Sequence, residues 1–117
     1  MTPDDFRRLA LSLPEATENA HMAHPDFRVR GKIFATLGYP KEGWGMVKLS
    51  PEQQELIIEE EPGIFVPAKG AWGRSGCTTV DLESVDERTL HDAIIKAWLN
   101  TAPKKLAKQF EEREQDR

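Results

Sequence analysis

The sequence contains a single cysteine, Cys77, among its 117 residues. One cysteine cannot form an intrachain disulfide, and it cannot supply the several thiolates of a cysteine-based zinc site. No apolar run approaches the roughly 20 residues that a membrane-spanning helix needs. The first ten residues also lack the basic segment and apolar block of a signal peptide. We therefore expect a cytoplasmic protein without a membrane anchor.

Positive charge is in deficit, because 16 basic residues face 20 acidic ones and the formal net charge is −4. A net negative field repels phosphate and disfavours indiscriminate nucleic-acid binding. The charges are nevertheless segregated. The segment 21–50 has five cations and two acids, and 63–80 has two cations and no acid. The segments 52–62 and 81–92 hold five acids each, so the predicted sheet is basic and the predicted helices are acidic.

A strand is predicted over Asp26–Leu37, because apolar and polar residues alternate there with a period of two. One face would bury Phe27, Val29 and Ile33. The opposite face would carry three cations at every second position together with an aromatic ring: Arg28, Arg30, Lys32 and Phe34. A solvated strand face needs polar residues, but it does not need them all to be positive.

The remaining elements follow from capping residues and periodicity. Helices are predicted at 3–13, 51–60, 87–100 and 104–110, and strands at 16–22, 44–49, 64–68 and 77–82. The segment 38–43 has the composition of a hairpin loop, and 69–76, with three glycines, that of a flexible loop. If the hairpin pairs as expected, Trp44 and Lys48 join the basic face.

These elements predict an α+β fold in the order α-β-β-β-α-β-β-α. It would be a two-layer sandwich, with an antiparallel sheet and helices on one of its faces. The length allows a single domain, which we place at residues 1–110, followed by a charged C-terminal tail at 111–117. The open sheet face is the basic, aromatic one.

No catalytic or metal constellation is predicted. Cys77 alternates within a strand and has no histidine at a recognisable spacing, so an inert packed thiol is expected. His21 and His24, near Asp26, could contribute metal ligands, but three residues apart on one strand they would face opposite sides. We therefore expect no enzymatic activity, no metal and no cofactor.

Several segments, taken together and in order, resemble the MmcQ/YjbR family of small bacterial proteins. They are Phe27-x-Val29-x-Gly31-Lys32-Ile33-Phe34-Ala35, Val47-Lys48-Leu49-Ser50-Pro51-Glu52, Pro62-Gly63, Trp72-Gly73, Thr78-Thr79-Val80, Ala97-Trp98 and Ala102-Pro103-Lys104-Lys105-Leu106. The resemblance implies a CyaY-like or secretion-chaperone-like α/β fold and a "double wing" DNA-binding domain, with no established catalytic residue or cofactor. The two wings would be the hairpin around Gly38–Gly43 and the loop around Gly70–Gly76.

Two functions stay open at this point. In the first, the basic face and the two loops bind DNA, with cations on phosphates and rings stacking on bases. The candidate residues are Arg28, Arg30, Lys32, Phe34, Trp44, Lys48, Lys69, Trp72 and Arg74. In the second, the same open face binds a protein partner or a second copy of the chain. A sheet face whose cations only solvate it, and a Trp72 that packs on the core, would favour neither function.

Overall fold

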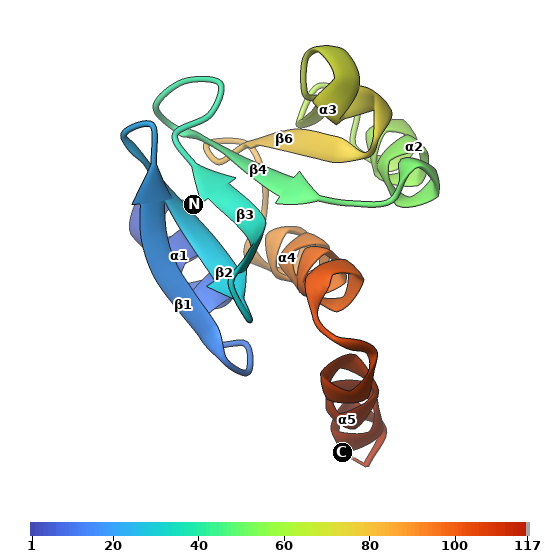
Figure 1. The fold of residues 1–117 in the computed structure, drawn as a ribbon. Coiled ribbons are helices and arrows are strands. Elements are labelled where there is room, and N and C mark those ends of the chain that lie inside the picture. Colours follow the sequence, from blue (N-terminus) through green and yellow to red (C-terminus); the bar gives the residue numbers. More distant parts are fainter. Residues whose placement is uncertain (117) are drawn as a thin grey trace.

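The computed structural model describes residues 1–116, which form a six-stranded sheet and five helices (Figure 1). The helices are α1 (Pro3–Leu11), α2 (Pro51–Glu60), α3 (Gly70–Arg74), α4 (Glu87–Thr101) and α5 (Lys104–Gln115). The strands are β1 (Ala16–His21), β2 (His24–Val29), β3 (Lys32–Leu37), β4 (Trp44–Lys48), β5 (Phe65–Pro67) and β6 (Cys77–Asp81). The predicted α+β class with an antiparallel sheet is confirmed.

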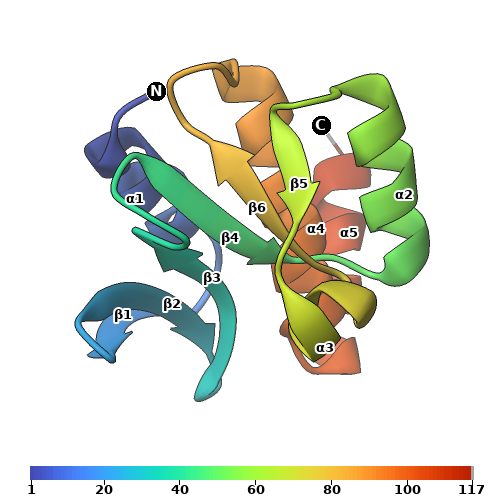
Figure 2. The same ribbon diagram turned by 90° about the horizontal axis from the view of Figure 1, so that it is seen from above.

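The strands are ordered β1-β2-β3-β4-β6-β5, and every neighbouring pair is antiparallel. α1 and α4 cover one face, where Phe27, Val47 and Val80 are fully buried against Ile94 and Trp98. α2 packs beside the edge strand β5, as the view from above shows (Figure 2). α3 lies on the side of the sheet opposite α4 (Figure 1). The second face is therefore partly covered, whereas the sequence predicts it to be open.

The predicted strand at 26–37 is two strands, which corrects the predicted element order. Val29 pairs with Lys32, so the chain reverses through Arg30 and Gly31, both with positive φ (52° and 80°). Positive φ at both central residues is the geometry of a two-residue hairpin turn. The alternating pattern continues through this turn, which is why periodicity alone reads the segment as one strand.

A bulge in β3 also changes which ring is buried. The register moves from Phe27 opposite Ala35 to Arg28 opposite Ile33, which leaves Phe34 as the extra residue. Phe34 therefore turns into the core and is completely buried, while Ile33 moves to the other face and is half-buried. The prediction that Phe34 lies on the open face and Ile33 in the core is wrong.

Helix ends follow the sequence closely. Ser50 caps α2 and its hydroxyl accepts from the Gln53 amide at 3.1 Å, and Asp86 accepts from the Thr89 amide at 2.7 Å at the start of α4. α4 ends before Pro103, as predicted, and α5 returns Phe110 to Trp98 with ring centroids 5.1 Å apart. α5 continues to Gln115 and so takes in most of the predicted charged tail. Arg117, the last residue of that tail, lies outside the described residues.

Candidate ligand-binding cleft

A cleft of about 430 Å³ lies on the second face of the sheet, beneath α3. It is lined by residues from β1, β3, β4, β6 and the α3 region: His21, Ile33, Thr36, Met46, Lys48, Trp72, Ser75 and Cys77. Its volume falls in the range of roughly 300–1,000 Å³ that is typical of small-ligand sites. The predicted open face is therefore a partly covered cavity rather than a flat surface.

The register of the sheet places the cleft floor. Thr36 pairs with Met46, and Lys48 pairs with Cys77, so these side chains project from the same face. Thr36, Met46 and Cys77 are all buried, and the Lys48 side chain reaches solvent at the rim. The floor is mostly apolar and its rim is cationic.

The α3 segment forms the wall of the cleft, where the sequence predicts a flexible loop. Gly73 is buried so close to the strand that a Cβ there would lie 1.8 Å from the Ala68 carbonyl oxygen. Gln54 of α2 donates to the carbonyl oxygens of Gly73 and Cys77, both at 3.0 Å. Gly73 thus serves close backbone packing, and Gln54 anchors α3 to the rest of the fold.

Trp72 is the most prominent residue of this wall. It lines the cleft yet is 55% exposed, and it lies between the exposed Lys69 and Arg74. The structure decides between the two sequence-based alternatives for Trp72, because the ring does not fold back onto the core. Of the predicted site residues, Lys48 and Trp72 line the cleft, and Lys69 and Arg74 are exposed at the two ends of α3.

Two predicted cations are already paired with acids. Arg28 donates from Nε to Asp26 at 2.8 Å, and Arg30 donates from Nε to Glu15 at 2.5 Å. Each arginine makes a second bond to the same carboxylate, at 3.1 Å and 3.0 Å. Their positive charge is neutralised by these carboxylates, so the two arginines add little to the electrostatic potential over the cleft.

Two further predicted residues lie outside the cleft lining. Lys32 is exposed, and as the register partner of the buried Val29 it projects from the side of α1 and α4. Trp44 is half-buried, lines a separate surface depression, and has the Lys41 ammonium 6.0 Å from its ring centroid. The structure therefore does not join these two residues to the cleft mouth.

A polar cluster lies at the β1–β2 hairpin, where the sequence suggests only weak candidates for metal ligands and not the contacts of Asp26 with His21 and Arg28. Asp26 is completely buried, and its carboxylate contacts His21 Nδ1 at 2.7 Å as well as Arg28. Hydrogen bonds from Arg28 and then from His21 hold the pKa of the Asp26 carboxyl below its ordinary value, although burial acts in the opposite direction. His21 and His24 are register partners across a turn at Met22 and Ala23, so they share a face. The prediction that the two histidines face opposite sides is therefore wrong. The sequence signal was that two residues lie between them, as a two-residue hairpin turn requires.

Thr36 carries an unsatisfied polar atom at the cleft floor. It is 2% exposed, and its Oγ1 is the one buried side-chain oxygen or nitrogen without a hydrogen-bond partner in residues 1–116. A buried hydroxyl without a partner costs roughly 1–3 kcal/mol. Such an atom marks either a local cost or a contact that a ligand completes.

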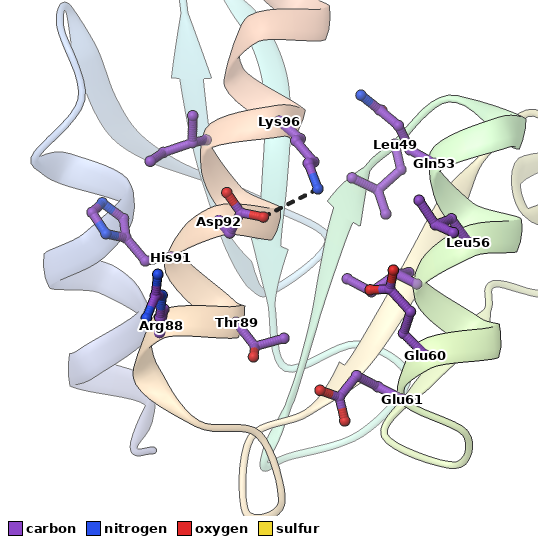
Figure 3. A pocket seen from close by; sticks show the side chains of 12 residues that line it. Leu49, Gln53, Leu56, Glu60, Glu61, Arg88, Thr89, His91, Asp92 and Lys96 are labelled. Atoms are coloured by element: carbon purple, nitrogen blue, oxygen red, sulfur yellow. Dashed lines mark ion pairs between the residues drawn. The ribbon is translucent and has the colours of Figure 1, made fainter. Parts of the chain in front are cut away.

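A second groove, of about 410 Å³, lies between α2 and α4 (Figure 3). Glu60 and Glu61 extend from α2 into it, and Asp92 and Lys96 of α4 form an ion pair at 3.1 Å (Figure 3). Its lining contains none of the site residues predicted from the sequence. Because its walls carry charges of both signs, it does not define a ligand as clearly as the cleft does.

Across the described part of the chain, no three His, Cys, Asp or Glu side chains are grouped as a metal site would require. In the same residues no helix is both long and apolar enough to cross a membrane.

The fold and the cleft together define a small α+β domain with a cavity on its sheet. A family model described as YjbR matches residues 11–100, and the chain belongs to this family. The crystal structure of Deinococcus radiodurans protein DR2400, assigned to the domain DUF419, is similar, with a TM-score of 0.72 and 21% sequence identity. The similarity covers 84% of this chain and 76% of that one, and at this identity it supports the fold alone. No curated protein matched.

Proposed function

We propose that this protein is a non-enzymatic binding domain for single-stranded DNA, which it holds at the mouth of the cleft and along α3. The exposed ring of Trp72 offers a stacking surface for a base. Lys48 at the cleft rim and Lys69 and Arg74 at the two ends of α3 are exposed and have no ion-pair partner among the described residues, so they are available to phosphates.

The observation that carries this proposal is the sign of the charge in the cleft. The chain has a net charge of −4, yet none of the described residues that line the cleft is Asp or Glu. The groove between α2 and α4, by contrast, is lined by Glu60, Glu61 and Asp92. An acidic protein that keeps acids out of one aromatic, cationic cavity favours an anionic ligand with a planar part.

Pairing of Arg28 and Arg30 within the fold limits the strength of this binding. Three free cations correspond to about three phosphate contacts, so log K should fall with log salt with a slope of about −2 for a single strand. We expect weak affinity that is measurable at low salt and is lost as salt rises. Of the nine residues predicted from the sequence, this proposal keeps four: Lys48, Lys69, Trp72 and Arg74.

The test is fluorescence anisotropy with a labelled, short oligothymidylate at about 50 mM salt, where non-specific contacts are still strong. Trp72→Ala should lower affinity about tenfold, the effect of losing one base stack. Lys69→Gln and Arg74→Gln should each reduce the salt slope by about 0.7. Leu56→Ala is the control, because Leu56 is 54% exposed and lies on α2, away from the cleft. Absence of binding by the folded protein, or equal effects of Trp72→Ala and Leu56→Ala, would refute the proposal.

A protein-interaction role is the second candidate, and the edge of the sheet favours it. β1 is an edge strand whose residues 17–20 are all exposed, and Met22 at its hairpin tip is 85% exposed. A free strand edge is a template for an added strand from a partner or from a second copy. Sedimentation of the wild-type protein and of Ala20→Pro would test this role, because the Ala20 N–H donates to the Asn19 side chain and not to β2, so proline there removes a donor from the free edge. A monomer at all concentrations would exclude self-association.

A further inference from the structure

The cleft has the size of a site for one unit of a ligand rather than for a continuous strand. Its volume of about 430 Å³ lies near the lower end of the range for small-ligand sites. A strand that merely crosses the sheet needs a groove along its path, whereas a cavity of this size accepts one nucleotide. The following inference rests on the proposed function and concerns which part of the strand enters.

Two side chains that can carry positive charge line the cavity, His21 and Lys48. The His21 ring is held by its Nδ1 against Asp26 at 2.7 Å, which leaves Nε2 for a ligand. The negative charge of Asp26 is matched by Arg28, which donates to both carboxylate oxygens at 2.8 Å and 3.1 Å. The charges of Asp26 and Arg28 cancel within this cluster, and Lys48, which lines the same cavity from β4, leaves the charge of the cleft positive.

This pair of groups fits a phosphate monoester better than an internal phosphate. A monoester carries a charge of about −1.5 to −2 at neutral pH, whereas each internal phosphodiester carries a single charge. A phosphate at His21 Nε2 would place the ring between two anions, an arrangement in which both ring nitrogens donate. Lys48 would supply the second charge from the rim.

Thr36 supplies a third polar group on the floor. Its unpartnered Oγ1 is shielded from solvent, but a 120° rotation about χ1 moves the hydroxyl to the position of the methyl group. A bound phosphate oxygen would give this hydroxyl an acceptor. The cost of leaving the hydroxyl unpaired in the free protein would then be recovered on binding.

We propose that the cleft binds a nucleotide through its terminal phosphate monoester, with Lys48 and His21 on the phosphate and Trp72 stacked on the attached base. The phosphate can belong to a strand end or to a free mononucleotide. These two sources share the same chemistry, and they are separated by the probes below.

The experiment compares four probes: one short oligothymidylate with a 5′-phosphate, with a 3′-phosphate and with neither, and thymidine monophosphate. The wild-type protein should bind one of the two phosphorylated strands about tenfold more tightly than the unphosphorylated strand, the effect of one charge-assisted hydrogen bond. Lys48→Gln and His21→Ala should abolish this preference. Lys69→Gln should weaken all strands alike, and Lys108→Gln, an exposed position on α5, should change nothing.

Each result has a defined meaning. Equal affinity for all three strands, or an unchanged preference in Lys48→Gln, overturns the terminal-phosphate site while leaving strand binding intact. Binding of thymidine monophosphate without binding of any strand supports the cleft and refutes the proposed function. Because Lys48 is exposed, Lys48→Gln should fold normally, and thermal unfolding of each variant checks this. Thr36→Val, which keeps the shape of the side chain, should reduce the preference without unfolding the protein.

Discussion

Asp26 and Thr36 are register partners on β2 and β3, and one is fully hydrogen-bonded while the other has no partner. Both are buried, at 0% and 2% exposure. Arg28 and His21 satisfy the Asp26 carboxylate from the same hairpin. The cleft therefore has one hydroxyl without a partner on its floor and, through His21, borders a hydrogen-bonded charged cluster. Mutations of these two features should have opposite effects on stability.

Removal of the Asp26 charge should destabilise the protein. Asp26→Asn leaves Arg28 beside a neutral amide within a buried cluster, and we expect a loss of about 2–3 kcal/mol in the free energy of unfolding. Urea denaturation measures this loss. The control is Asp92→Asn, because the Asp92 side chain is 64% exposed and pairs only with Lys96 within one helix, so its loss should cost less than about 0.5 kcal/mol. Equal effects of the two substitutions would contradict the cluster.

The same carboxyl should contribute to the acid sensitivity of the fold. Hydrogen bonds from Arg28 hold the pKa of Asp26 below its ordinary value of 3.8, so the unfolded chain takes up this proton first as the pH falls. The stabilisation is complete above pH 3.8 and is lost as the pH falls through the folded-state pKa. Asp26→Asn should flatten the dependence of stability on pH below about 4. If the stability of this variant fell below pH 4 as steeply as that of the wild type, Asp26 would not be the group that titrates.

Thr36→Val should have the opposite effect to Asp26→Asn. The substitution removes a buried hydroxyl without a partner and keeps the branched shape that fits the strand, so unfolding should become harder by about 1 kcal/mol. Thermal unfolding without ligand measures this change. Thr79→Val is the comparison, because the Thr79 hydroxyl donates to the Val66 carbonyl oxygen at 2.8 Å and its removal should destabilise. Equal destabilisation by both variants would mean that the Thr36 hydroxyl is satisfied in solution.

Caps and helical periodicity predicted α1, α2 and α4 well, because these signals are local. Thr2, Ser50 and Asp86 each cap the helix that they were expected to begin. The central hairpin could not be found in the same way. Arg30 adopts a positive φ that few residues other than glycine prefer, so the turn was hidden in an otherwise regular pattern.

The site was only partly predictable for a related reason. The one-residue bulge at Phe34 inverts the faces of its neighbours, and its position depends on pairing with β2 rather than on the local sequence. The ion pair Arg30–Glu15 depends on the chain reversal before β1, whereas Arg28 and Asp26 pair within β2, where residues two apart share a face. Charge counting along the sequence finds a surplus of cations at 21–50, but it could not show which of these cations are already paired.

Gly73 should prove indispensable to the cleft. A Cβ at this position would lie 1.8 Å from the Ala68 carbonyl oxygen, and that oxygen is backbone and cannot swing aside. Gly73→Ala must therefore displace α3, at a cost of about 2 kcal/mol or more, the range for overpacking. The displacement should also abolish strand binding, because Trp72 moves with α3. Ala71→Ser, at an exposed position of the same helix, should change stability by less than about 0.5 kcal/mol and leave binding intact. If Gly73→Ala retained wild-type stability and binding, α3 would be an adjustable loop, and the Trp72 wall would not be preorganised for its ligand.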